Sequence, residues 1–101
     1  MTRAQLAHWL DERRPTPPPT LRAHLDAAVA SLEPADAALP DQLASLGRRL
    51  LERVASAPGQ PRAHALDLLA ADALVTYAFE AQSEADVSAL AALGERVARM
   101  R

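Results

Sequence analysis

Apolar residues recur every three or four positions along most of the chain. Between residues 39 and 57 the intervals are 4, 3, 4, 4 and 3, and residues 21–32 and 87–100 have the same kind of spacing. This period places side chains along one face of an α-helix and leaves polar residues on the other. The positions are Leu21, Leu25, Ala28, Val29 and Leu32, then Leu39, Leu43, Leu46, Leu50, Val54 and Ala57, then Val87, Leu90, Leu93, Val97 and Met100.

The stretch from residue 61 to residue 82 differs because it is apolar on almost every side. Its regular polar residues, Asp72, Thr76 and Glu80, follow one another every four positions. At about 100° per residue they form a strip roughly 80° wide. We expect a central helix that the other helices, or a second chain, must cover. The strip is either its solvent edge or a buried row that pairs with one of four arginines, Arg48, Arg49, Arg53 or Arg96.

Local signals mark the ends of the first two helices. Thr2 and Gln5 have the spacing of a capping box, so the first helix begins there and runs to about residue 14. The segment "PTPPP" at 15–19 stops it, because proline has no amide proton, and forms a stiff, extended hinge. The second helix begins at Pro18 or Pro19 and ends near Leu32.

Similar signals divide the rest of the chain. Pro40 begins a third helix, "PGQP" at 58–61 separates it from the fourth, and Ser83 to Asp86 has the spacing of a cap for the fifth. Short connections make successive helices antiparallel neighbours. We therefore predict an all-α protein with a single domain over residues 1–101. An antiparallel four-helix bundle over 20–101 carries an additional N-terminal helix over 1–14, joined by the proline-rich hinge over 15–19.

Two pairs of segments resemble each other in order along the chain. "RAHLDAAVA" at 22–30 resembles "RAHALDLLAA" at 62–71, and "LASLGRRL" at 43–50 resembles "LAALGERV" at 90–97. The bundle is therefore two duplicated hairpins, or the likeness is chance in a chain rich in Ala and Leu. The second pair places Gly47 and Gly94 in mid-helix, where glycine costs about 1 kcal/mol relative to alanine. These glycines either line close helix crossings or face solvent.

Composition narrows the classes of function. Half of the 101 residues are apolar, Lys, Ile, Asn and Cys are missing, and this usage is typical of a GC-rich bacterial genome. The net charge is −2 with acids and bases interleaved, which gives no basic face for nucleic acid. The absence of cysteine excludes disulfides and thiolate metal sites. We see no signal peptide and no apolar run that could span a bilayer, and expect a cytoplasmic protein with no cofactor and no nucleic-acid or membrane partner.

No set of residues stands out as catalytic or metal-binding. Three histidines each precede an aspartate by two or three positions, which we interpret as local hydrogen-bonded pairs, because a metal site in a bundle requires further carboxylates. The spacing of Arg3 and His8 resembles the Arg-x(4–6)-His pattern of a class of helical-bundle ribonucleases, which implies a small nuclease or hydrolase as a remote alternative. The pairs are His8 and Asp11, His24 and Asp26, and His64 and Asp67.

The pattern favours a non-enzymatic protein that acts by protein–protein association, as a homodimer or as an accessory or regulatory subunit. Alanine buries little area, so a small Ala/Leu core gains from association. The alternative is a bundle that binds a small apolar ligand or lipid in a cavity lined by Leu68, Leu74, Val75 and Phe79. A hydrolase would need Asp72 and Glu80, or Arg3 and His8, to face each other across a pocket. Candidate interface residues are Trp9, Leu74, Tyr77 and Phe79.

Overall fold

The computed structural model describes residues 2–32, 37–56, 59 and 61–100. Helix accounts for 84% of these residues and none of them forms a strand, so the predicted all-α class is confirmed. The elements are α1 (Arg3–Asp11), α2 (Pro19–Ala30), α3 (Leu39–Ser56), α4 (Pro61–Asp86), the short 3-10 helix η1 (Val87–Ala89) and α5 (Leu90–Arg99).

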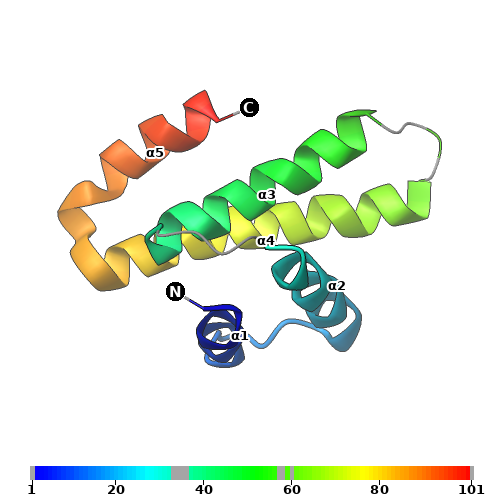
Figure 1. The fold of residues 1–101 in the computed structure, drawn as a ribbon, viewed down its shortest axis with the longest axis horizontal. Coiled ribbons are helices and arrows are strands. Elements are labelled where there is room, and N and C mark those ends of the chain that lie inside the picture. Colours follow the sequence, from blue (N-terminus) through cyan, green and yellow to red (C-terminus); the bar gives the residue numbers. More distant parts are fainter. Residues whose placement is uncertain (1, 33–36, 57–58, 60, 101) are drawn as a thin grey trace.

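The two longest helices form the centre of the molecule. α3 and α4 lie side by side and run in opposite directions, and α5 turns back from the far end of α4 (Figure 1). α1 is seen nearly end-on in the same view and α2 is also steeply inclined, so both lie across the α3–α4 hairpin. This arrangement does not confirm a bundle of four antiparallel helices. It does place α4 against both α3 and α2, as expected for a central helix.

The start of α1 is capped as the sequence predicts. The Gln5 amide donates to the Thr2 hydroxyl over 3.1 Å, and the Thr2 amide donates to the Gln5 side-chain oxygen over 2.8 Å. α1 is nevertheless shorter than expected because it ends at Asp11, and α2 ends at Ala30. The predicted turn that follows α2 lies partly outside the described residues, as does half of the "PGQP" segment.

The predicted cap at Ser83 is wrong, because α4 continues through this residue to Asp86. The Ser83 hydroxyl instead donates to the carbonyl of Glu80, one turn earlier in the same helix, over 2.8 Å. The cap falls three residues later, where the Asp86 carboxylate accepts from the Ser88 amide over 3.1 Å and begins η1. α4 is therefore a turn longer than its apolar stretch.

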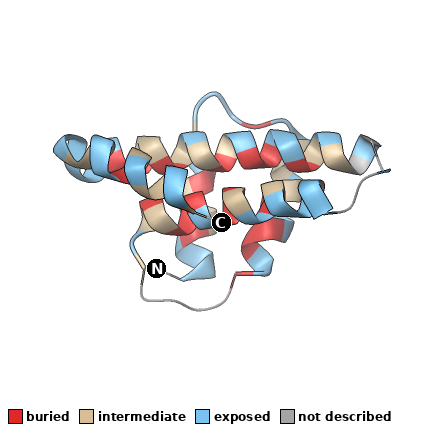
Figure 2. Cartoon of the chain, turned by 90° about the horizontal axis from the view of Figure 1, so that it is seen from above, coloured by how far each residue is buried: buried red, intermediate tan, exposed pale blue. Residues whose placement is uncertain are grey.

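The core lies where the helices cross and consists of leucine and alanine together with Val29. Buried and exposed residues alternate along the long helices, as amphipathic helices require (Figure 2). No helix among the described residues has both the length and the apolar character needed to cross a membrane. Large side chains that are almost fully buried are Leu6, Leu10, Leu25, Leu43, Leu46, Leu74 and Leu93.

Gly47 marks a close crossing of α3 and α4. A Cβ atom built on it would lie 2.8 Å from Cγ2 of Val75 and 3.2 Å from the carbonyl oxygen of Ala71. The same atom on Gly94 would meet only the ring of Phe79, at 3.9 Å. The close-crossing prediction is thus correct for Gly47 alone. The two segments that resemble each other do not pack alike at this position.

Candidate interaction surface

One side of α4 remains uncovered by the described part of the chain. Its exposed residues recur at intervals of three and four from Arg62 to Thr76, and include Leu68 at 47% and Leu69 at 56% exposure. We call this set the outer face of α4. Its members are Arg62, Ala65, Leu68, Leu69, Asp72 and Thr76.

The predicted polar strip of α4 divides into an exposed part, which belongs to the outer face, and a partly buried part. Asp72 and Thr76 are exposed, as expected for a solvent edge. Glu80 is partly buried and accepts a hydrogen bond from Arg13 over 3.2 Å. The arginine that pairs with the strip is therefore one that the sequence analysis did not consider.

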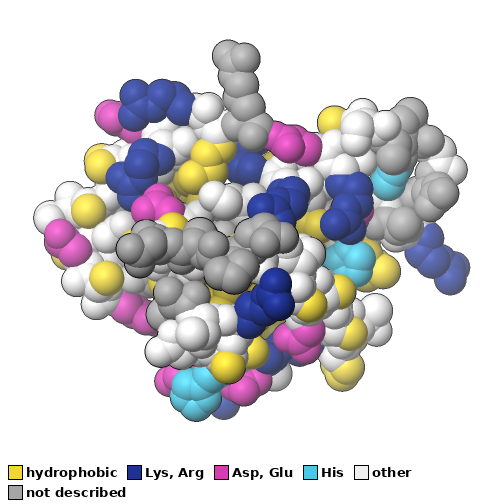
Figure 3. All heavy atoms as spheres, in the orientation of Figure 1, with side chains coloured by type: hydrophobic (Ala, Val, Ile, Leu, Met, Phe, Trp, Pro, Cys, Tyr) yellow, Lys and Arg dark blue, Asp and Glu magenta, His cyan; other side chains and the backbone are white. Residues whose placement is uncertain are grey.

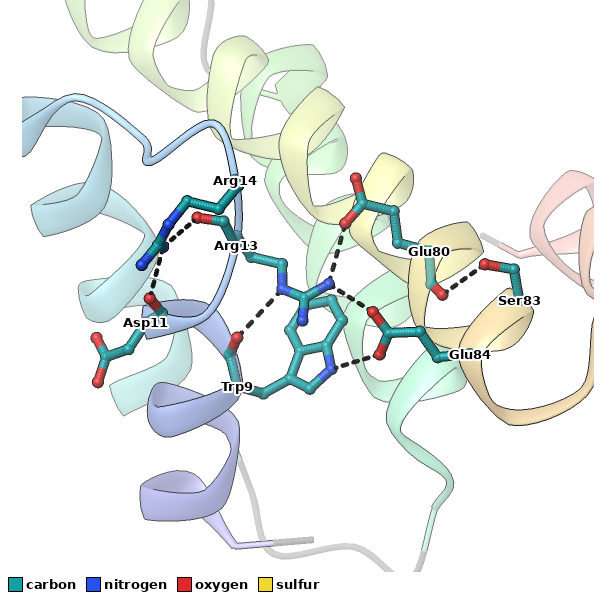
Figure 4. A network of polar contacts seen from close by, with 7 residues as sticks. All are labelled: Trp9, Asp11, Arg13, Arg14, Glu80, Ser83 and Glu84. Carbon is teal, nitrogen blue, oxygen red and sulfur yellow. Dashed lines mark hydrogen bonds and ion pairs between the residues drawn. The ribbon is translucent and has the colours of Figure 1, made fainter.

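Arg13 fastens the end of α1 to α4 (Figure 4). It bridges Glu80 and Glu84, with the bond to Glu84 at 2.8 Å, while its guanidinium lies 3.6 Å above the centre of the Trp9 ring. The Trp9 indole N–H completes the cluster by donating to Glu84 over 3.3 Å. A guanidinium stacked on an indole and bonded to two carboxylates holds one rotamer, so this cluster fixes α1 on its own chain.

The charges of this cluster shift the affinities of its members for protons. The hydrogen bond from Arg13 lowers the pKa of Glu84, chiefly because it stabilises the carboxylate. Burial by itself lowers the pKa of Arg13, but the bonds to Glu84 and Glu80 outweigh it, and the net pKa is raised. Burial and the nearby charge of Glu80 raise the pKa of Tyr77. Arg13 and Glu84 are thus firmly charged near neutral pH.

The four candidate interface residues lie in different environments. Leu74 is 0% exposed and belongs to the core of this chain, so it offers no surface to a partner. Trp9 and Tyr77 are partly buried and meet edge to face, with ring centres 5.9 Å apart. Phe79 is also partly buried against the core. The large exposed apolar residues of α4 are instead Leu68, which was expected to line a cavity, and Leu69, which was not among the candidate residues.

A second polar cluster ties α2, α3 and α4 together. Asp67 on α4 is 4% exposed, and its carboxylate lies 2.6 Å from Nε2 of His24 on α2. Arg53 on α3 approaches the same oxygen at 3.7 Å. A buried carboxylate is costly unless charged or hydrogen-bonding partners surround it, and these two supply that compensation.

The predicted local His–Asp pairs do not form, because Asp11, Asp26, Asp67, His8 and His24 each contact another residue. His8 pairs with Glu12 at 3.4 Å rather than with Asp11. The partner of Asp67 is His24, 43 residues away, and not His64. Asp11 and Asp26 both pair with Arg22, at 2.7 and 2.8 Å. Two of these contacts, His8–Glu12 and Arg22–Asp26, join residues four apart, and the other two join different helices.

The residues that a hydrolase would need do not converge. Arg3 donates to the carbonyl of Leu32 over 2.9 Å, whereas the side chain of His8 is 78% exposed and pairs with Glu12. Asp72 faces solvent while Glu80 is bound by Arg13. No group of three or more metal-ligating side chains occurs within the residues that the structure describes.

The predicted lining of a ligand cavity is also divided. Leu74 is buried in the core and Leu68 is 47% exposed, so these two residues do not face a common space. Two grooves between described residues lie elsewhere. One of about 430 Å³ runs along α1 beside His8 and Trp9, and one of about 220 Å³ lies between Arg48 and Met100.

Charges on the face seen in Figure 3 are mixed, with basic and acidic side chains interspersed. Arg96 pairs with Asp41 at 3.0 Å and Arg99 with Glu95 at 3.6 Å, so several arginines are neutralised locally. Comparisons add no assignment, because no family model, curated protein or solved structure matches the chain.

Proposed function

We propose that this chain is a small non-enzymatic helical protein that acts by protein–protein association, as a homodimer or as an accessory or regulatory subunit, through the outer face of α4. The observation that supports this function is the exposure of Leu68 and Leu69, adjacent leucines in the first half of α4. Single exposed apolar residues are normal in folded proteins, but contiguous ones on one helix face are typical of interaction sites.

The energy available from this face is modest but useful. Complete burial of a leucine side chain contributes roughly 1.5–3 kcal/mol, and these two leucines are about half exposed. A partner that covers both would gain about 2 kcal/mol from them, before neighbouring residues contribute. Ala65 lies one turn from Leu69 and would let a second helix approach closely.

The proposal treats residues 20–101 as the four-helix associating unit, with α1 as an added helix. α1 has its own attachment to α4 through Arg13 and Trp9 and leaves the outer face of α4 clear. The proposed activity needs no cofactor, nucleic acid or membrane. A bacterial, cytoplasmic setting, which the composition favours, is part of the same proposal.

Sedimentation equilibrium over a wide range of protein concentration tests this function. We expect the mass of the wild-type chain to rise above 10.8 kDa as concentration increases. The double substitution Leu68→Gln and Leu69→Gln should hold the mass near that of one chain. Val87→Gln is the matched control, because Val87 is 65% exposed but lies beyond the end of α4.

Two results would count against the proposed function. One is a wild-type chain that remains monomeric at every concentration. The other is a leucine double variant that associates as strongly as the wild type. Native mass spectrometry adds a third observation, because a monomer that retains an apolar small molecule would support the alternative of a ligand-binding protein.

A further inference from the structure

The outer face of α4 carries opposite charges on either side of its apolar residues. Arg62 lies at one end of the face, and Asp72 lies ten positions further along the same helix. At about 1.5 Å per residue the two are separated by about 15 Å along the helix axis. Ala65, Leu68 and Leu69 lie between them.

These two charges have no ion-pair partner within the described residues. The other ionisable side chains between Arg62 and Asp72 are less exposed, since Asp67 is buried against His24 and His64 is partly buried. From Arg62 to Asp72 the outer face therefore presents a positive charge, an apolar middle and a negative charge.

We infer that the partner of this face is a second copy of the chain, packed with α4 antiparallel to α4. The inference rests on the proposed function and names its partner. A two-fold axis at the level of residue 67 would bring Arg62 of each chain opposite Asp72 of the other. The same register brings Ala65 opposite Leu69, so a small side chain meets a large one on both sides of the axis.

Other arrangements of the same face are less favourable. A parallel two-fold pairing would place Arg62 opposite Arg62 and Asp72 opposite Asp72, and like charges in contact are repulsive. Charge complementarity thus selects both the direction and the register, in the way that interhelical ion pairs select partners in coiled coils.

The dimer should be weak. The outer face spans about four turns of one helix, which is a smaller area than the roughly 800 Å² per partner of a standard stable interface. We therefore expect a dissociation constant in the micromolar range or weaker, with a clear dependence on salt because exposed ion pairs are screened.

Charge reversal tests this register. Sedimentation equilibrium measures the dissociation constants of the wild-type chain and of four variants. Arg62→Glu alone places two acids together at both ends of the interface, and Asp72→Arg alone places two arginines together. Each single variant should weaken dimerisation roughly tenfold. The double variant Arg62→Glu, Asp72→Arg reverses both ends, restores opposite charges and should return the dissociation constant to within about threefold of the wild-type value.

Arg49→Glu provides the matched control. It changes the net charge as Arg62→Glu does, on an exposed residue of α3 outside the proposed interface. It should leave dimerisation within about twofold of the wild type, because distant exposed charges are screened. Melting at low concentration verifies that each variant folds, which is expected because Arg62 and Asp72 are exposed.

The outcomes separate this inference from the proposed function. Weakening by both single variants and recovery in the double variant would support the antiparallel pair. A second outcome is a chain whose association is lost on substitution of Leu68 and Leu69 but is unchanged by charge reversal. This outcome would overturn the register and leave the proposed function standing. Failure of the double variant to recover would also overturn it. A wild-type chain that never associates would overturn both.

Discussion

Replacing Gly47 by alanine should destabilise the protein, although alanine is the better helix former. Gly47 lies in mid-helix, where the substitution would gain about 1 kcal/mol from helix propensity alone. The added methyl group would lie 2.8 Å from Cγ2 of Val75 and 3.2 Å from a backbone oxygen of α4. Overpacking of this kind costs roughly 1–3 kcal/mol, because the backbone of α4 would have to move. The net change is a loss of up to about 2 kcal/mol.

Gly94→Ala is the matched control, since Gly94 also lies in mid-helix and its new methyl group would be 3.9 Å from Phe79. This variant should gain up to about 1 kcal/mol, because the propensity term is unopposed. Urea unfolding followed by circular dichroism, at a concentration where the chain is monomeric, measures both. The two midpoints should differ by on the order of 1 M. Equal stabilisation of both variants would refute the close crossing of α3 and α4.

Three further predictions concern the polar contacts. Glu84→Gln should make stability less dependent on acid pH, because the folded-state pKa of Glu84 is lowered from 4.5. The contribution of Glu84 to stability is present above that value and is lost as pH falls through the lowered pKa. Melting curves across this pH range would show the same profile for the variant and the wild type if the Arg13 contact were unimportant. Asp67→Asn should lower the free energy of unfolding in urea by roughly 1–3 kcal/mol, because it removes a buried charged partner of His24. Asp26→Asn is the control and should cost less than about 0.5 kcal/mol, since its ion pair with Arg22 is exposed. Similar losses for the two variants would contradict the buried cluster. Thr2→Ala should cost about 0.5–1 kcal/mol of stability and loosen α1, because it removes the cap of this helix. The fluorescence of Trp9, the sole tryptophan, would report the change, and an unaltered spectrum and stability would argue against the cap.

Sequence patterns predicted the helices well because helix formation depends on local spacing. The apolar period located α2, α3 and α5, and the capping box at Thr2 required only residues within one turn. The error at Ser83 shows the limit of local signals. A serine can begin a helix or bond back to the carbonyl one turn earlier within it, and only the continued packing of α4 decides between these roles.

The polar contacts were harder to predict because they join distant parts of the chain. Arg13 and Glu80 are 67 residues apart, and His24 and Asp67 are 43 apart. The spacing of Trp9 and Arg13 within the predicted first helix was an available signal, since residues four apart in a helix share a face. Nothing local, however, indicated which carboxylates they would meet.

The exposed side of α4 was unpredictable for a related reason. A helix that is apolar on nearly every side contains no periodic signal for the direction of the core. Leu68 and Leu74 look equivalent in sequence, yet one is 47% exposed and the other fully buried. The choice depends on where α2 and α3 pack, which only the tertiary structure reveals.

Disulfide formation between chains tests the outer face of α4 most directly, because the natural chain has no cysteine. One preparation carries Ala65→Cys and the other Leu69→Cys, with Ala27→Cys on the exposed side of α2 as the control. The Ala65→Cys and Leu69→Cys preparations are mixed under mild oxidation. We predict that the disulfide between positions 65 and 69 forms faster than the 65–65 and 69–69 disulfides. It should also form faster than any disulfide through position 27. Equal rates for all of these links would contradict the account.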